Sequence, residues 1–565
     1  MRGPAAPKDP VEKRPCLYVV LDKTISGSED AEGVIRDYVF LEDRLIDQVR
    51  FTSGDIDESL LQMLPKMETF RKLVHSVGVS IKAEDPQIRD QNVEFQFQCY
   101  GRTDKYTTGT VMEMTLPCTG EEMVLPIEAY PVNEDDDYFG SFNFIFPEAN
   151  KNMSLTIKFY VNDGYEVPEI QVDPPVLFDS QEYREMISRS LVSTGNNYRL
   201  KRVIEKCKRG EDVTIAYIGG SITQGAGGKP INTMCYAYRS YEAFCDMFSP
   251  CGGDNVHYVK AGVGGTPSEL GMVRYDRDVT KDGEIKPDLV IIEFAVNDEG
   301  DETEGVSFES LVMKILQAEQ APAVLLNFAV FMSDWNLQDR LQPIGERYEL
   351  PMVSVKDAVV PQFDENQVIT KRQFFYDIYH PTNDGHRIMA DCIACLFKAV
   401  DQEEMAAEDI QLDKQPVYGI QFKDIVRFDR KDVSDYATIS RKGFDAWDKD
   451  IQYVERDMDL KATPEFEDNW MNDGSVQDAE FKMKIQCKNL VAVIKDSGSS
   501  EFGTADISVD GSIVKSINPL DNGWSHCNPQ IIIDEKESAE HEVVFRMKKG
   551  DEGKKFTILG FGVTK

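Results

Sequence analysis

The sequence lacks any long hydrophobic run. No stretch approaches the roughly 18 consecutive apolar residues that a membrane-spanning helix needs. The polar beginning, residues 1–8, has neither the basic start nor the apolar run of a signal peptide. We therefore expect no membrane partner and a cytoplasmic location, and secretion stays open as the alternative if a signal peptide was trimmed.

Basic residues are also in deficit: 62 Lys and Arg stand against 99 Asp and Glu, for a formal net charge of -37. Such a surface repels phosphate backbones and anionic headgroups, which excludes nucleic acid and membranes as favoured partners. We interpret the charge as a solubility feature. A neutral substrate such as a sugar ester is not repelled by it, although the charge does not select such a substrate.

Cysteine is sparse: the 11 residues in 565 are an odd number and lack the density of a disulfide scaffold. Cys392 and Cys395 have the C-x-x-C spacing, but they lie in an apolar, helix-like run at residues 389–397. No second pair of Cys or His lies nearby in the sequence. We therefore expect these thiols to pack in a core rather than to bind a metal.

Two regions alternate apolar and polar residues with a period of two, which is typical of antiparallel sandwiches. The first runs from Val77 to Val172, and the second follows residues 413–416 and includes the hairpin signal Asp510-Gly511. Prolines between 168 and 175 mark a linker. The predicted organisation is an N-terminal extension of unclear structure (1–70), a β-sandwich (71–176), a catalytic domain (177–412) and a C-terminal, carbohydrate-binding-like β-sandwich (413–565).

The central region alternates strands with helices, which predicts an α/β domain with a parallel sheet covered on both faces. Expected strands are 213–218, 255–261, 288–294, 323–330 and 352–355, and expected helices lie near 234–249, 305–318, 335–348 and 383–400. In such sheets ligands bind at the carboxyl ends of the strands.

Four polar blocks stand at places where this fold would form a site. The first strand runs into Gly219-Gly220-Ser221, and the glycines allow another group to approach the serine hydroxyl. The second strand runs into a glycine turn at residues 262–265, and the third ends at Asn297-Asp298. The fourth block places Asp377 three residues before His380. The G-x-S-x-G elbow of α/β-hydrolases is absent, because Thr223 stands where its last glycine would be.

These blocks, in this order, resemble the SGNH (GDSL-type) hydrolase superfamily over roughly residues 195–400. The family pattern falls on Ser221, Gly265, Asn297, Asp377 and His380. Gly220 replaces the Asp that commonly precedes the serine, Lys260-Ala261 stands where Asn-Ala often opens the second block, and Ala295 takes the place of a frequent glycine. None of these departures removes a catalytic side chain.

The resemblance implies acyl transfer to a serine. Ser221 would be the nucleophile, His380 the general base and then the general acid, and Asp377 the residue that orients its imidazole. The backbone N–H groups of Ser221 and Gly265 and the side-chain amide of Asn297 would form the oxyanion hole. No metal and no organic cofactor is implied. We expect His386 to be structural and Asp298 to order the Asn297 loop.

The fused sandwiches and the Gly-Gly-Ser-Ile-Thr block are similar to bacterial carbohydrate acetylesterases. This implies an acetylated carbohydrate substrate of the xylan or mannan kind. Trp524 and Trp335 are candidate sugar contacts, because aromatic rings pack on pyranose faces, although a packing role is the alternative for each. A lipase or thioesterase-type acylhydrolase and a noncatalytic carbohydrate-binding protein remain alternatives. The sequence decides neither the sugar, nor the hydroxyl that is deacetylated, nor the oligomeric state.

Overall fold

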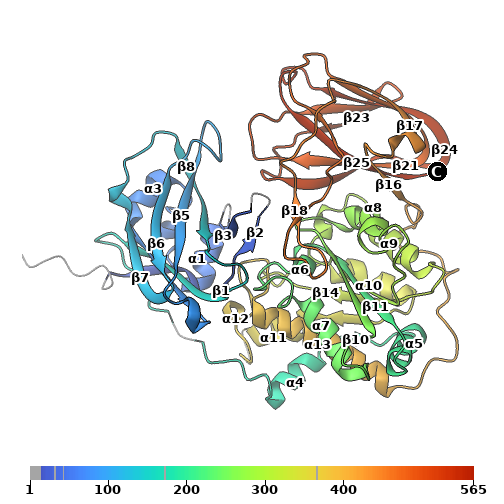
Figure 1. Ribbon diagram of the computed structural model, residues 1–565, viewed down its shortest axis with the longest axis horizontal. Coiled ribbons are helices and arrows are strands. Elements are labelled where there is room, and N and C mark those ends of the chain that lie inside the picture. The colour runs from blue at the N-terminus through green and yellow to red at the C-terminus, as the bar shows by residue number, and fades with distance from the viewer. Residues whose placement is uncertain (1–13, 31–32, 42–43, 171–172, 364–366) are drawn as a thin grey trace, which may run out of the picture. The chain divides into compact units, whose positions relative to one another are not determined.

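The structure is a computed structural model that describes residues 14–30, 33–41, 44–170, 173–363 and 367–565. The chain forms two compact units (Figure 1). The first unit contains Met1–Val176 and Thr370–Asn383, and the second contains Leu177–Ile369 and Asp384–Lys565. No helix in the described ranges is long and apolar enough to cross a membrane.

The first unit is the expected antiparallel sandwich, drawn in blue in Figure 1. Apolar residues alternate toward its core: along β5, Val93, Phe95 and Phe97 are fully buried, whereas Glu94 between them is exposed. One sheet has the order β1 (Cys16–Ile25), β9 (Met153–Val161), β4 (Val74–Ala83), β7 (Thr119–Pro126), and the other has β2 (Ser28–Glu29), β3 (Ile35–Phe40), β8 (Asp136–Ile145), β5 (Asn92–Gly101), β6 (Val111–Pro117).

Residues 1–70, for which the sequence predicted no clear structure, supply part of this sandwich. Within them the structure describes β1 to β3, the helices α1 (Leu45–Ser53) and α2 (Glu58–Leu61), and the start of α3 (Met67–Leu73). Residues 1–13, including the polar beginning, lie outside the described part of the chain.

The second unit is built on a six-stranded sheet that matches the predicted α/β domain. Its order is β10 (Leu191–Ser193), β15 (Met352–Ser354), β14 (Ala323–Phe328), β13 (Leu289–Glu293), β11 (Val213–Gly219), β12 (Val256–Gly262). All pairs are parallel except β10 with β15. Because β12 and β13 lie on opposite sides of β11, the chain reverses direction across the sheet there, and such a switch point opens a crevice at the carboxyl ends.

Helices precede, join and follow these strands. They are α4 (Gln181–Ser188), α5 (Tyr198–Lys208), α6 (Ser221–Gln224), α7 (Tyr236–Phe248), α8 (Ser268–Asp278), α9 (Val306–Leu316), α10 (Gln338–Arg347), α11 (Val355–Pro361) and α13 (Asn383–Gln402). Cys392 is buried and Cys395 half-buried on α13, and both are free thiols.

The C-terminal sandwich follows in the same unit. Its strands are β16 (Val426–Phe428), β17 (Ala437–Lys442), β20 (Trp470–Asn472), β21 (Glu480–Asp496), β22 (Ala505–Val509), β23 (Ser512–Ile517), β24 (His526–Met547) and β25 (Phe556–Thr564). Register shifts between β21 and β24 mark bulges, which bend long strands around a core. Asp510 and Gly511 both have positive φ, of 50° and 84°, which confirms the predicted hairpin turn.

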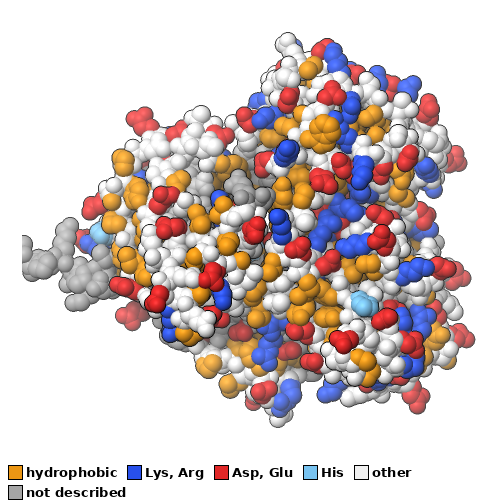
Figure 2. All heavy atoms as spheres, viewed as in Figure 1, with side chains coloured by type: hydrophobic (Ala, Val, Ile, Leu, Met, Phe, Trp, Pro, Cys, Tyr) orange, Lys and Arg blue, Asp and Glu red, His pale blue; other side chains and the backbone are white. Residues whose placement is uncertain are grey.

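The sandwich and the α/β domain share buried apolar residues, because Val491, Val493 and Cys527 pack in one cluster with Leu270 and Val273. A small hairpin, β18 (Tyr453–Val454) with β19 (Thr463–Pro464), lies in the chain between β17 and β20 of the sandwich. On the face shown in Figure 2, acidic side chains are spread across the surface rather than gathered in one area.

Candidate active site

Ser221 stands at the turn between β11 and α6, where two glycines are required by their surroundings. A Cβ atom at Gly219 would lie 2.2 Å from the hydroxyl of Thr223, and one at Gly220 would lie 2.1 Å from Oδ1 of Asn297. The side chain of Asn297 therefore lies directly against the serine turn. This explains why glycine replaces the Asp that commonly precedes the serine in SGNH hydrolases.

Asn297 follows β13 and is held by its neighbour Asp298. The buried Asp298 carboxylate accepts hydrogen bonds from the backbone N–H of Ser268, at 2.7 Å, and from its hydroxyl, at 2.8 Å. Burial raises the pKa of Asp298 well above its ordinary value. These bonds tie the Asn297 loop to the start of α8, as the sequence predicted. Within the described residues, Oδ1 of Asn297 is buried without a partner, and Nδ2 makes no protein hydrogen bond that would compete with a ligand.

Gly265 lies in the loop after β12 with a φ of 72°, a backbone conformation that favours glycine. The neighbouring Gly264 N–H donates to Oε1 of Gln224 at 2.9 Å, and a Cβ atom at Gly264 would lie 3.7 Å from that of Ser221. No acceptor in the described part of the chain bonds the N–H of Gly265. The structure thus brings Ser221, Gly265 and Asn297 to the adjoining carboxyl ends of three strands.

Asp377 and His380 form a hydrogen-bonded pair. Oδ2 of Asp377 lies 2.8 Å from Nδ1 of His380, and Oδ1 accepts from the backbone N–H groups of Tyr379 and His380, at 2.8 and 2.7 Å. The three-residue spacing therefore turns the carboxylate back onto the ring. Because Nδ1 donates to Asp377, Nε2 is the ring nitrogen through which a general base would transfer a proton.

The ionisation of Asp377 is fixed by opposing effects. Burial opposes the charged form, but the hydrogen bond and charge of His380, together with the guanidinium of Arg44, outweigh it and lower the pKa of Asp377 below its ordinary value. Arg44 lies 3.7 Å from Asp377, and its guanidinium carbon lies 4.6 Å from the centre of the Tyr379 ring. Arg44 could not be predicted from the sequence, because no local motif marks it.

The Asp-His segment belongs to the first unit and is anchored there. Nζ of the buried Lys23 on β1 donates to the carbonyl oxygens of Phe375, at 2.5 Å, and Arg372. Arg372, on the short helix α12 (Lys371–Phe374), makes a two-pronged ion pair with Asp173 at 2.9 and 2.8 Å. The site residues therefore form two groups: Asp377 with His380 in the first unit, and Ser221, Gly265 and Asn297 in the second.

The two tryptophans differ in their surroundings. Trp524, in the loop between β23 and β24, is 40% exposed, and its ring would meet a Cβ atom at Gly265 at 2.7 Å. It therefore lies beside the oxyanion-hole candidate. Trp335 is half-buried in the loop after β14 and stacks on Phe331, with ring centres 5.9 Å apart.

His386 has the structural role that was expected of it. It is fully buried at the start of α13, where Nδ1 accepts from the backbone N–H of Tyr236 at 3.1 Å and Nε2 lies 3.0 Å from the carbonyl oxygen of Ala226. Both nitrogens are thereby engaged by the backbone. Within the described ranges, no group of three or more His, Cys, Asp and Glu side chains is arranged to hold a metal.

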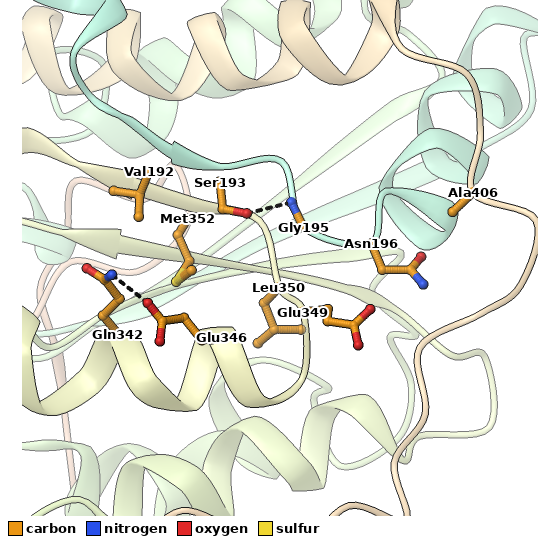
Figure 3. Close-up of a pocket in the computed structure, with 11 residues that line it drawn as sticks. Val192, Ser193, Gly195, Asn196, Gln342, Glu346, Glu349, Leu350, Met352 and Ala406 are labelled. Atoms are coloured by element: carbon orange, nitrogen blue, oxygen red, sulfur yellow. Dashed lines mark hydrogen bonds between the residues drawn. The ribbon is translucent and has the colours of Figure 1, made fainter.

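An open cavity of about 650 Å³ lies elsewhere in the second unit (Figure 3). Met352 at the start of β15 and Glu346 on α10 line it, and Gln342 donates to Glu346 at 2.8 Å along the same helix. The cavity is at the amino end of β15, whereas the serine, glycine and asparagine stand at carboxyl ends. It is therefore separate from the candidate site.

Comparison with known protein families supports this site. Residues 217–388 match the profile of the GDSL-like lipase/acylhydrolase family, and all five pattern residues lie in that stretch. This stretch is an SGNH-type hydrolase domain, and the chain is an esterase.

Solved structures extend the likeness of this SGNH esterase beyond its catalytic domain. A two-domain esterase active on acetylated mannans is 28% identical, with a TM-score of 0.58, over 67% of this chain and 99% of its own. A second structure of such an esterase, co-crystallised with mannopentaose, is 27% identical, with a TM-score of 0.57, over 67% and 98% of the two chains. No curated protein sequence matches the chain.

Proposed function

We propose that this SGNH esterase removes O-acetyl groups from plant-type polysaccharides or oligosaccharides, of the xylan or mannan kind, through an acyl-enzyme. The observation that carries the proposal is the packing of Asn297 and the Gly264-Gly265 loop against the Ser221 turn. A hydroxyl beside two unengaged N–H donors suits attack on a carbonyl carbon. The likeness to an esterase active on acetylated mannans supports the choice of substrate.

The proposed reaction has two steps. Nε2 of His380 takes the proton of Ser221 as its oxygen bonds to the acetyl carbon, and the resulting oxyanion accepts hydrogen bonds from Ser221, Gly265 and Asn297. The intermediate collapses, the C–O bond to the sugar breaks, and His380 returns the proton to the sugar oxygen. Water then attacks the acetyl-serine with the same general base, which releases acetate and restores the serine.

Trp524 is the proposed sugar contact. Its exposed ring lies beside Gly265, so a pyranose that carries the reacting ester would reach the ring face. Trp335 is the second candidate. Replacing Trp524 by Ala should raise KM for an acetylated oligosaccharide while leaving KM for p-nitrophenyl acetate nearly unchanged.

The test is acetate release from acetylated mannan and xylan oligosaccharides, compared with hydrolysis of long-chain p-nitrophenyl esters. Ser221→Ala should lower kcat by about 10³-fold or more, because it removes the nucleophile. Equal acetate release by wild type and Ser221→Ala would overturn the proposal. A preference for long-chain esters would indicate a lipase-type enzyme, and sugar binding without turnover would indicate a binding protein.

A further inference from the structure

The loop that carries Gly265, the proposed oxyanion donor, has a flexible backbone unless other residues restrain it. Gly264 and Gly265 are consecutive glycines, and glycine has more backbone freedom than any other residue. An oxyanion hole works because its donors are fixed before charge develops. The restraint on this loop comes from residues that follow the catalytic domain in the sequence.

Gln452 holds the first of the two peptide groups that flank Gly265. Its Nε2 donates to the carbonyl oxygen of Gly264 at 2.8 Å, and its Oε1 accepts from the backbone N–H of Cys527, on β24, at 3.0 Å. The Gly264 carbonyl and the Gly265 N–H belong to one planar peptide group. Gln452 therefore sets the direction of that N–H, and a bond at the carbonyl end also strengthens donation at the nitrogen end.

His526 holds the second peptide group. Nε2 of His526, at the start of β24, lies 2.9 Å from the carbonyl oxygen of Gly265. Its Nδ1 lies 3.0 Å from Oδ2 of Asp496, a fully buried residue on β21 whose carboxylate also accepts from Asn522 and Asn528. A backbone carbonyl can only accept a hydrogen bond, so Nε2 of His526 donates to Gly265.

The face of the His526 ring is also held. The Trp524 ring centre lies 4.7 Å from that of His526, within the range of an aromatic pair. His526 thus links Asp496 to the Gly265 carbonyl, with one contact at each ring nitrogen, and these two contacts restrain the orientation of the ring.

We propose that the C-terminal sandwich, including the segment between its strands β17 and β20, is a working part of the esterase, in which Gln452 and His526 position Gly265 for oxyanion binding. The inference rests on the proposed function, because it takes the Gly265 N–H as an oxyanion donor. Both are positioning residues, and neither is assigned contact with the reacting ester. The sandwich then contributes to turnover itself, in addition to any contact that Trp524 makes with sugar.

The test measures kcat and KM of the full-length chain on p-nitrophenyl acetate for Gln452→Ala, His526→Ala and His526→Gln. Displaced catalytic groups cost up to about 10²-fold in rate, so we expect kcat to fall about 10- to 100-fold while KM stays within about twofold. His526→Gln should retain more activity than His526→Ala, because its amide can still donate to the Gly265 carbonyl. Labelling of Ser221 by a fluorophosphonate, whose phosphoryl oxygen uses the same donors, should slow in parallel.

His541→Gln is the matched control. His541 is also a buried histidine of this sandwich paired with an aspartate, with Nδ1 2.8 Å from Asp510. The His541→Gln variant should leave kcat unchanged. If Gln452→Ala and both His526 variants keep the kcat of this control, or lose activity only in proportion to unfolded protein, the inference is wrong. If Ser221→Ala releases acetate as fast as wild type, the proposed function itself fails, and the inference falls with it.

Discussion

At the scale of single residues, the site depends on glycines, whose lack of a side chain leaves room for neighbouring groups. Gly220 leaves room for the Asn297 amide, and Gly265 combines a φ of 72° with an indole ring 2.7 Å from where its Cβ would be. The first glycine could be predicted from its place next to the serine. The neighbour of the second could not, because Trp524 lies far along the chain and only the folded sandwich brings it there.

Gly265→Ala should therefore damage both stability and turnover. A non-glycine residue at positive φ costs roughly 1–3 kcal/mol, and the added methyl would push against the Trp524 ring. We expect kcat to fall about 10- to 100-fold, because the N–H donor is displaced. Urea unfolding and acetyl-ester kinetics measure the two effects.

Gly511→Ala separates the backbone cost from the loss of function. Gly511 also has positive φ, of 84°, but nothing lies within 4 Å of its added Cβ in the hairpin of the C-terminal sandwich. This variant should lose stability and keep its kcat. Wild-type kcat in Gly265→Ala would show that the Gly265 loop does not contribute to catalysis.

The site residues that can be predicted from the sequence stand in local motifs. Those that cannot be predicted depend on contacts with distant parts of the chain. Ser221, Asn297 and the Asp377–His380 pair stand in short motifs that can be recognised from neighbouring residues alone. Arg44 and His526 act through partners that are far away in the sequence. No periodicity or motif marks such residues, because their role arises only when distant strands meet.

At the scale of elements, the carboxyl end of β13 carries a buried acid behind the serine turn. Glu293 is fully buried, and its Oε2 accepts from the hydroxyl of Thr223 at 3.2 Å. Burial raises the pKa of Glu293 to about 8. The folded protein therefore holds a proton on Glu293 that the unfolded chain releases near pH 4.

This difference predicts a pH-dependent stability. Between about pH 4 and pH 8 the folded state binds more protons than the unfolded state, so the contribution of Glu293 is full at low pH and is lost as pH rises. Glu293→Gln cannot titrate, so its unfolding free energy should fall less steeply over this range than that of wild type. By pH 8 the variant should have gained stability relative to wild type, on the order of 1–4 kcal/mol. Urea unfolding between pH 4 and pH 9 measures it.

Glu319→Gln is the surface control for this prediction, because the Glu319 side chain is 88% exposed. Its stability profile should run parallel to that of wild type. A Glu293→Gln profile parallel to both would show that Glu293 is ionised in the folded protein.

The elements that sequence reasoning missed have physical features that hide them. The strands β11, β13 and β14 are continuous apolar runs, which is why their positions were predicted within a few residues. In contrast, α8 buries Glu269, Arg274 and Asp278, and Arg274 donates to the carbonyl oxygens of Ala261 and Gly219. A helix whose buried face is charged shows no apolar period. The strand β10 escapes notice because it has only three residues.

At the scale of the whole molecule, the first unit is assembled from two pieces of chain. Its sandwich comes from the N-terminal residues, and the segment 370–383 with Asp377 and His380 joins it from within the sequence of the SGNH domain. Lys23 is the buried link, since its ammonium group serves two carbonyl groups of that segment. The sandwich thus holds the proposed general base.

Lys23→Met should loosen this segment. The change leaves the carbonyl oxygens of Arg372 and Phe375 without their donor, and a buried unpaired carbonyl costs about 1–3 kcal/mol. We expect kcat to fall about tenfold and amide hydrogen exchange in residues 370–383 to rise.

Lys151→Met serves as the comparison, because Lys151 makes a partly exposed ion pair with Asp85 at 3.0 Å in the same sandwich. Surface pairs of this kind contribute at most about 1 kcal/mol, so little should change. Equal exchange and equal kcat in the two lysine variants would show that Lys23 does not support the Asp-His segment.

The sandwiches were predictable where alternation is regular, and the start of the first one was not. The β1 ladder with β9 shifts register twice, between Tyr18 and Val20 and again before Lys23, and Asp22 has a positive φ of 48°. Each irregularity breaks the period of two on which the sequence prediction depends. Nor does the composition of residues 370–383 indicate that this segment joins the sandwich.

The two-piece construction of the first unit also limits how this protein can evolve. Recombination often exchanges accessory modules at linkers, yet a replacement for residues 1–176 would have to supply new partners for Arg372 and for the carbonyl oxygens that Lys23 binds. The N-terminal module and a downstream stretch of the hydrolase gene must therefore be inherited together.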